Sequence, residues 1–257
     1  SYGNHIIEPG TGELASHLVG KGRMEEPENI IRVLAAYFSA SGDLAGKKIL
    51  ITAGPTYEKI DPVRFIGNYS SGKMGFALAE ACAGRGAEVT LVTGPVCLQT
   101  SHPCIHRVDV ETAAEMANQA QLYFQQADAG ILCAAVADFT PETTAGYKIK
   151  REKDDLTLRL KPTQDIAAML GQVKTSKQKL IGFALETNDE QHNAQSKLER
   201  KNFDFIVLNS LNDSGAGFRY DTNKISIIDR QGHTDYPLKS KSEVAQDIIN
   251  RLVEELQ

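Results

Sequence analysis

The sequence predicts an α/β fold of the Rossmann-like, doubly wound type, with a mostly parallel sheet and a projecting β-hairpin. Short runs rich in Ile, Leu and Val alternate with longer segments of helical periodicity from Lys47 onward. Apolar strands that alternate with helices indicate a parallel sheet covered on both faces. Residues 146–161 break the alternation, because they alternate with period two on both sides of Asp154 and Asp155. That pattern predicts a hairpin that projects from the sheet.

The expected elements follow in chain order. Residues 28–38 carry apolar side chains at helical spacing directly after Pro27, a residue that favours the first helical position, so a helix is expected there. The later segments are assigned by the same periodicities. Strands are expected at 48–53, 88–93, 105–109, 129–134, 179–184 and 205–208, and helices at 72–85, 111–126, 164–173, 189–201 and 241–256.

The chain is expected to contain two parts. Residues 1–46 contain glycine-rich, strandless sequence around Gly10 and Gly20, then the amphipathic segment 28–38, and end in the linker 39–46. The alternation of strands and helices fills 47–257, which has ample length for a buried core. We therefore expect an end segment with a linker at 1–46 and one domain at 47–257.

Composition narrows the class of protein. The chain has 257 residues, of which 41% are hydrophobic and 24% charged, and its net charge of −5 argues against a general nucleic-acid binder. No apolar run reaches the roughly 18 residues of a transmembrane helix, and the N-terminus has no signal-peptide pattern, so a cytoplasmic location without membrane contact is expected. Without a C-x-x-C pair, the four cysteines are interpreted as small buried apolar residues rather than disulfides or zinc ligands.

The segment Gly67–Gly75 resembles a P-loop but departs from it in two ways. It contains G-x-x-x-x-G-K, but Met74 stands where a P-loop has Ser or Thr, and a long loop separates it from the preceding strand. The alternatives are an anion site at a helix N-terminus and a glycine-rich helix start capped by Ser70 or Ser71.

Three further segments could carry chemistry. Asp138 follows an apolar strand, where it could bind a ligand or Mg²⁺ or simply cap the next segment. Lys148 and Lys150 share one face of the hairpin, and Lys197 and Lys201 share one face of a helix. Each pair could contact phosphates or simply face solvent. His102 and His106 have no convergent partners, so no metal site is expected there.

Taken together, these segments resemble the phosphopantothenoylcysteine synthetase half of the bacterial bifunctional coenzyme A biosynthesis flavoproteins, a phosphopantothenoylcysteine decarboxylase fused to a phosphopantothenate–cysteine ligase. Residues 1–38 resemble the tail of the decarboxylase half of that family. The residues that carry the resemblance are 20–27, 51–56, 61–66, 68–76, 134–138, 148–150 and 182–187.

The resemblance implies a CTP-dependent ligase, phosphopantothenate–cysteine ligase. The carboxylate of 4′-phosphopantothenate would attack the α-phosphate of CTP, releasing pyrophosphate, and cysteine would then displace CMP from the acyl-cytidylate. Such nucleotidyl transfer depends on positive charge and a metal around the phosphates, so Mg²⁺ with CTP is the expected cofactor. Because the flavin-binding core of the family would precede this chain, FMN is not expected to bind.

The resemblance also implies roles for particular residues. Lys148 would stabilise the triphosphate in the first step, and Asn68 would serve the second step as a neutral amide. The residues expected to bind substrate are Asn68, Ser70, Ser71 and Gly72. Those expected to bind nucleotide are Leu132, Cys133, Ala134, Asp138, Lys148, Pro162, Asp165, Phe183, Lys197 and Lys201.

The resemblance further implies a homodimer with the 146–161 hairpin as its arm, and a decarboxylase domain as partner in the full-length chain. Two other classes of protein fit the sequence less well. A nicotinamide-dependent oxidoreductase requires G-x-G-x-x-G after the first strand, where this chain has Ala53–Thr56 instead. A non-catalytic nucleotide-binding subunit would not need Asn68 and Lys148.

Overall fold

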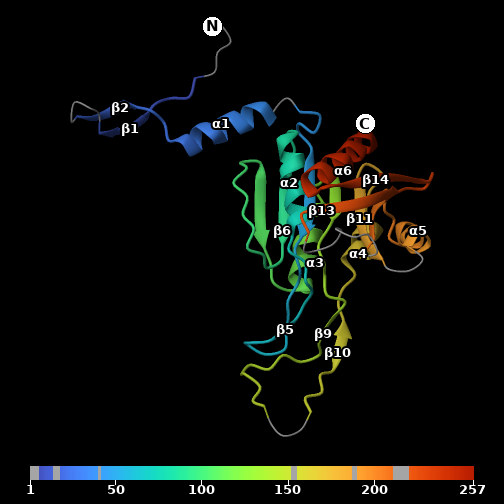
Figure 1. The fold of residues 1–257 in the computed structure, drawn as a ribbon. Coiled ribbons are helices and arrows are strands. Elements are labelled where there is room, and N and C mark those ends of the chain that lie inside the picture. Colours follow the sequence, from blue (N-terminus) through green and yellow to red (C-terminus); the bar gives the residue numbers. More distant parts are fainter. Residues whose placement is uncertain (1–5, 14–17, 40–41, 152–154, 187–189, 211–219) are drawn as a thin grey trace.

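An eight-stranded sheet forms the centre of the molecule, with the strand order β14-β13-β12-β11-β8-β3-β6-β7 (Figure 1). The structure is a computed structural model that describes residues 6–13, 18–39, 42–151, 155–186, 190–210 and 220–257. The strands of this sheet are β3 (Lys48–Ala53), β6 (Glu88–Thr93), β7 (Ile105–Asp109), β8 (Ala129–Leu132), β11 (Lys179–Glu186), β12 (Phe205–Ser210), β13 (Thr222–Ile228) and β14 (His233–Ser240).

Six of these strands run parallel in the order expected of a doubly wound fold. The chain starts in the middle at β3, moves outward through β6 to β7, returns to β8 on the other side of β3, and continues through β11 to β12. The strand order therefore reverses between β3 and β8. In such sheets, ligands bind beyond the carboxyl ends of the strands at this reversal.

Helices cover both faces of the sheet. Alternate residues of each strand point to opposite faces, so Ile49 and Ile51 of β3 pack under one pair of helices while Leu50 packs under the others. The first face is covered by α2 (Lys73–Gly84) and α6 (Lys241–Leu256), and the second by α3 (Ala113–Phe124), α4 (Ile166–Val173) and α5 (Glu190–Arg200). The predicted α/β class is therefore confirmed.

The antiparallel edge of the sheet was not predicted. β13 pairs antiparallel with β12 and with β14, and the turn between β13 and β14 is held by Asp229, whose Oδ1 accepts hydrogen bonds from the backbone of Gln231 and Gly232. Ile225 and Ile227 of β13 are buried, so this hairpin extends the core. The predicted helices begin and end within two residues of the expected ranges, and α3 differs by two residues at each end.

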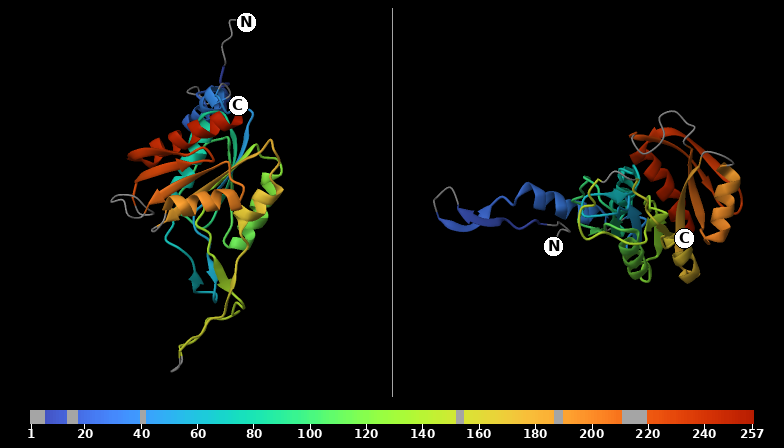
Figure 2. Two further views of the ribbon diagram at one scale, coloured as in Figure 1. Left: turned by 90° about the vertical axis from the view of Figure 1, so that its right-hand side faces the viewer. Right: turned by 90° about the horizontal axis from the view of Figure 1, so that it is seen from below.

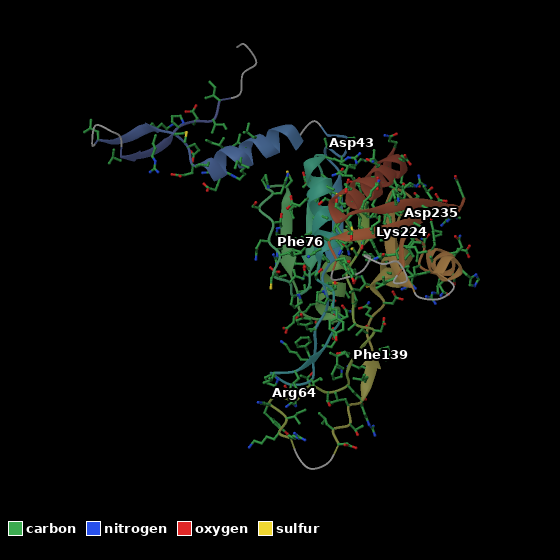
Figure 3. The ribbon with its side chains drawn as sticks, in the orientation of Figure 1. Asp43, Arg64, Phe76, Phe139, Lys224 and Asp235 are labelled. Carbon is green, nitrogen blue, oxygen red and sulfur yellow. The ribbon has the colours of Figure 1, made fainter. Side chains whose placement is uncertain are left out.

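An arm projects from the carboxyl-end side of the sheet (Figure 1). Its paired part is formed by β9 (Phe139–Pro141) and β10 (Leu160–Pro162), and the short strands β4 (Glu58–Lys59) and β5 (Phe65–Ile66) lie beside its base. The expected hairpin of 146–161 is thus displaced, because the ladder joins 139–141 to 160–162 and the described residues between these two strands have no strand pairing. Figure 3 shows Arg64 and Phe139 on the segments that project beyond the sheet.

The N-terminal elements lie at the end of the molecule opposite the arm and extend sideways from it (Figure 1 and Figure 2). The expectation that this segment has no strands is wrong, because β1 (Gly10–Glu13) and β2 (Val19–Arg23) pair as a hairpin that leads into α1 (Pro27–Ser39). The expected boundary between 1–46 and 47–257 stays a prediction.

Within the described ranges, no helix combines the length and apolar character that crossing a membrane requires. The expected cytoplasmic location stays a prediction.

Candidate functional site

The largest gathering of the expected site residues surrounds a cleft at the point where the strand order reverses. We call it the main cleft, and its volume is about 440 Å³. The loops after β3 and β8 are joined there, because the backbone N–H of Ala135 donates to Gly54 at 2.9 Å and the N–H of Thr56 donates to Ala135 at 3.3 Å. The described residues that line it are Asn68, Ser70, Ser71, Gly72, Lys73, Met74, Gly75, Cys133, Ala134, Ala135, Val136, Asp138, Phe183, Ala184, Leu185, Lys197, Asn209, Asn223 and Lys241.

The glycine turn before α2 brings a helix N-terminus into the main cleft. Gly72 is the N-cap residue and has φ of 77°, a left-handed conformation that favours glycine. No side chain caps this helix, so the predicted cap by Ser70 or Ser71 is wrong; instead Ser70 Oγ accepts a hydrogen bond from the Gly72 N–H at 3.4 Å. Because no cap side chain occupies it, the helix start can meet an anion.

Gly75 lets α2 approach the sheet closely. A Cβ atom at this position would lie 2.5 Å from the Cβ of Ala53 in β3. Gly75 therefore serves the close packing of α2 on β3, whereas an anion site at the start of α2 stays a prediction.

Three lysines line the main cleft. Lys73 pairs with Asp221 at 2.6 Å, Lys197 donates to the carbonyl of Phe183 at 2.9 Å, and Lys241 donates to the carbonyl of Tyr220 at 2.5 Å. Lys241 is only 7% exposed. Burial, and next the repulsion from Lys73, lower the pKa of Lys241.

Two side-chain amide oxygens in the main cleft are buried and have no hydrogen-bond partner within the part of the chain that the structure describes. They belong to Asn68 and Asn209. Asn68 is held in place by its other end, because its Nδ2 donates to the carbonyl of Ala135 at 2.6 Å. A buried acceptor without a donor is rare in folded proteins and points to a missing ligand or water.

A second hollow, the side pocket, adjoins the main cleft and shares Ala134, Val136, Asp138, Phe183 and Lys197 with it. It brings together most of the residues expected around a nucleotide: Leu132, Ala134, Asp138, Pro162, Asp165, Phe183, Lys197 and Lys201. Cys133, the remaining strand-end residue of that set, lines the main cleft.

An ion pair between Asp165 and Lys201 lies at the side pocket, with 2.9 Å between Lys201 Nζ and Asp165 Oδ2. Asp165 is also the N-cap of α4, where its side chain accepts from the N–H of Ala168. Burial opposes ionisation of Asp165, but the hydrogen bonds from Ala168 and Lys201 outweigh it, and its pKa is lowered.

Lys148 is the one expected site residue that the structure does not bring to either hollow of this chain. It is exposed on the arm. Its neighbour Ile149 is anchored, because the Ile149 N–H donates to Asp61 Oδ2 at 3.1 Å, and Asp61 Oδ1 also accepts from the backbone N–H groups of Val63 and Arg64. The arm base is thus fixed to the loop after β3, while Lys148 points to no described cleft.

Sequence reasoning missed Lys241 and Asn209. A signal existed for each. Lys241 follows Ser240, which forms a capping box with Glu243 and so marks a helix start at the end of a strand. Asn209 directly follows the apolar run of β12.

The cysteines and histidines provide no further site. The cysteines are free thiols, but Cys97 is exposed, so the expectation that all four are buried is wrong. Burial raises the pKa of Cys133 to about 12, so its thiol is uncharged at neutral pH. His102 accepts from the N–H of Cys104, and among the described residues no cluster of His, Cys, Asp and Glu could hold a metal ion.

Known proteins similar to this chain include two curated relatives and a solved structure. The chain is 57% identical over 98% of its length to a protein named cysteine/cysteine sulfinic acid decarboxylase, from an unidentified prokaryote. It is 46% identical over 96% of its length to the coenzyme A biosynthesis bifunctional protein CoaBC of Bacillus subtilis. A crystal structure of the C-terminal domain of a CoaBC protein covers 84% of the chain at 40% identity, with a TM-score of 0.72.

The chain spans only part of the curated relatives. It covers 72% of the decarboxylase and 61% of the Bacillus subtilis protein, but 98% of the solved C-terminal domain. The activities named for these two relatives are therefore those of longer proteins.

These comparisons contradict the expected identity as a synthetase domain and the expected CTP-dependent ligase activity. The matching family is described as a flavoprotein domain and the 57% identical relative is named as a decarboxylase, so neither name is that of a ligase. The physical reason is that lysines and helix N-termini bind phosphate of any origin and do not identify a nucleotide. The expected place in coenzyme A biosynthesis agrees with the name of the Bacillus subtilis protein.

The same comparisons contradict the expected cofactors, Mg²⁺ with CTP, because these belong to the ligase reaction. The description of the family as a flavoprotein also contradicts the expectation that FMN has no place here.

The family assignment rests on most of the chain. Residues 44–256 match the pattern of the family described as DNA/pantothenate metabolism flavoprotein, C-terminal domain. The chain belongs to this family.

Proposed function

We propose that this chain binds a phosphorylated derivative of pantothenate in the main cleft, as part of an enzyme of coenzyme A biosynthesis. The observation that carries the proposal is the composition of the cleft. Lysine ammonium groups and a helix N-terminus lie there together with two buried amide oxygens that lack donors. Phosphopantothenate and phosphopantothenoylcysteine carry both an anion and several N–H or O–H donors. The name of the Bacillus subtilis relative supports the pathway.

The phosphate end is assigned to the starts of α2 and α6. These helices pack against each other, and each begins at a lysine that lines the cleft, Lys73 and Lys241. The dipole of α2 favours negative charge at its start, and Lys73 and Lys241 add positive charge there that the single carboxylate of Asp221 only partly offsets. The lowered pKa of Lys241 reflects burial and, next, the repulsion from Lys73.

Flavin fits the main cleft less well. Phe183 is the one aromatic side chain among the described residues that line it, and small residues, lysines and asparagines form the rest of the wall. An isoalloxazine ring needs broad apolar contact on its faces. We therefore assign the main cleft to the phosphorylated substrate rather than to flavin.

A calorimetric titration tests the proposal. The chain is titrated with 4′-phosphopantothenate, with phosphopantothenoylcysteine and with unphosphorylated pantothenate. We expect both phosphorylated compounds to bind at least about tenfold more tightly than pantothenate, because each charge-assisted hydrogen bond contributes about 1.5–3 kcal/mol. Equal affinity for all three, or no binding, contradicts the proposal.

A second candidate function, decarboxylation of a cysteine-derived carboxylate, is favoured by the name of the relative that is 57% identical. Loss of CO₂ breaks a C–C bond and leaves an electron pair, which an electron sink such as a flavin must accept. The lysines of the main cleft can hold a carboxylate but provide no such sink by themselves.

Release of labelled CO₂ from phosphopantothenoylcysteine, with and without added FMN, tests this candidate. The candidate requires CO₂ in stoichiometric yield with the decarboxylated product. Binding of the phosphorylated compounds without any release of CO₂ removes decarboxylation from this chain and leaves the substrate-binding proposal intact.

We also propose a homodimer joined through the arm. The arm and the loop at its base expose several large apolar side chains, which is a common mark of an interaction surface. They are Val63, Phe65, Phe139, Tyr147, Leu156 and Leu160.

A further inference from the structure

Asn209 occupies a position where the strand pattern calls for an apolar side chain. Phe205 and Val207 of β12 pack into the core beneath α2 and α6. Because side chains alternate along a strand, Asn209 points to the same face of the sheet as these two. Its register is fixed on both sides, by Leu185 of β11 and by Ile225 of β13. An amide therefore ends a column of buried apolar residues, at the place where that column meets the main cleft.

The amide oxygen of Asn209 has no hydrogen-bond donor among the described residues, although it is shielded from solvent. The oxygen of Asn68, which lines the same cleft, is in the same state. Buried polar atoms nearly always have a partner, and one without a partner indicates a group that the described residues do not supply. An amide oxygen accepts hydrogen bonds and cannot donate them. The missing partner must therefore be an N–H or O–H group.

The rest of the main cleft has the opposite chemistry. Lys73, Lys197 and Lys241 donate hydrogen bonds and carry positive charge, so they suit the anionic end of a ligand. An anion alone leaves both amide oxygens without donors. A ligand that satisfies the whole cleft combines an anion with N–H or O–H donors at a different place along its length.

We propose that Asn209 positions the substrate by accepting a hydrogen bond from an amide N–H or hydroxyl of its pantothenate part. This inference rests on the proposed function, and it adds a selectivity to it. The lysines recognise the phosphate, which many metabolites share, whereas Asn209 recognises a donor that distinguishes a pantothenate derivative from phosphate or a simple phosphate ester.

The test replaces Asn209 by leucine, a residue of similar shape that removes the acceptor without adding charge. The probes are 4′-phosphopantothenate, an analogue with an N-methylated amide, an analogue without the secondary hydroxyl, and inorganic phosphate. We expect N209L to bind phosphopantothenate about tenfold more weakly. We expect no such loss for the analogue that lacks the group bonded to Asn209, nor for inorganic phosphate. The matched control is N118L, which changes an exposed asparagine of α3 outside the main cleft.

Thermal unfolding of the free protein separates positioning from a structural role. A buried acceptor without a donor destabilises the unliganded fold, so we expect N209L to keep or raise the Tm of the free protein while it weakens binding. Equal weakening for every probe, or weakening accompanied by a lower Tm, overturns the role of Asn209. In that case the proposed function still holds as long as the unmodified chain binds phosphopantothenate. Failure of the unmodified chain to bind phosphopantothenate at all overturns the proposed function and this inference together.

Discussion

Lys241 shows how one buried charge makes binding depend on pH. Its side chain is close enough to Lys73, Asp221 and Cys133 to interact with their charges. Burial is the largest cause that lowers the pKa of Lys241, and the repulsion from Lys73 is the second. The protonated lysine attracts an anion and the neutral lysine does not. Affinity for the phosphorylated substrate is therefore complete below the lowered pKa of Lys241 and declines as the pH rises through it.

Because the pKa of Lys241 is lowered, we expect this decline in a window of pH that begins below the ordinary pKa of lysine, about 10.4. The measurement is the dissociation constant of phosphopantothenate across this window, for the unmodified chain and for K241Q. K241Q should bind more weakly at pH 7 and show a flatter profile, whereas the exposed control K177Q should follow the unmodified chain. Parallel profiles for K241Q and the unmodified chain contradict the role assigned to Lys241.

At the scale of residues, the sequence predicts a site residue where the predicted strands bring it to the same edge of the sheet as the others. Asp138 and Phe183 directly follow or lie within predicted parallel strands, so their meeting at one edge of the sheet follows from the fold class. Lys148 lies on the arm, whose course depends on the long-range contact between Asp61 and Ile149. No local pattern encodes that contact. Asn209 was missed because an asparagine after an apolar run is a weak signal until its buried oxygen is found to have no donor among the described residues.

At the scale of elements, the contact between α2 and β3 sets the position of the cleft wall. Gly75 allows this contact, since an added Cβ would lie 2.5 Å from the Cβ of Ala53. Gly84, at the other end of the same helix, has no atoms within 4 Å of an added Cβ. The two glycines therefore form a matched pair for substitution by alanine.

We expect G75A to lower the Tm and to weaken substrate binding, because α2 must move away from β3 and carry the glycine turn with it. In contrast, G84A should raise the free energy of unfolding by about 0.5–1 kcal/mol, since alanine favours the helix, and should leave binding unchanged. Thermal unfolding and calorimetry measure both. A G75A protein with unchanged Tm and affinity shows that the close packing does not position the cleft.

The parallel strands β3, β8, β11 and β12 were predicted well because each contains an apolar run between polar segments. β13 and β14 were missed although β13 does alternate, with Ile225 and Ile227 buried. The turn between them depends on Asp229 and on Gly232 rather than on a two-residue Asn-Gly type. The arm was predicted as a regular hairpin because its alternation is real, but its described middle has no strand pairing within this chain.

At the scale of the whole molecule, the arm should hold two copies of the chain together. Leu156 of the arm and Leu122 of α3 are both 56% exposed. Their side chains therefore expose a similar fraction of apolar surface to solvent, and the two positions differ in where they lie on the molecule. We expect L156D to shift the sedimentation of the chain from dimer to monomer, because a charge at the interface is desolvated without a partner. L122D should remain dimeric. Sedimentation of the unmodified chain as a monomer, or of L156D as a dimer, contradicts an arm-mediated interface.

The central claim is that the main cleft holds a phosphorylated pantothenate derivative. The most direct measurement is a crystal structure of the chain with 4′-phosphopantothenate. The account predicts density for the phosphate between the starts of α2 and α6, near Lys73 and Lys241, and an N–H or O–H of the pantothenate part within hydrogen-bond distance of Asn209 Oδ1. Density for the ligand elsewhere on the molecule, with the main cleft holding only water, contradicts it.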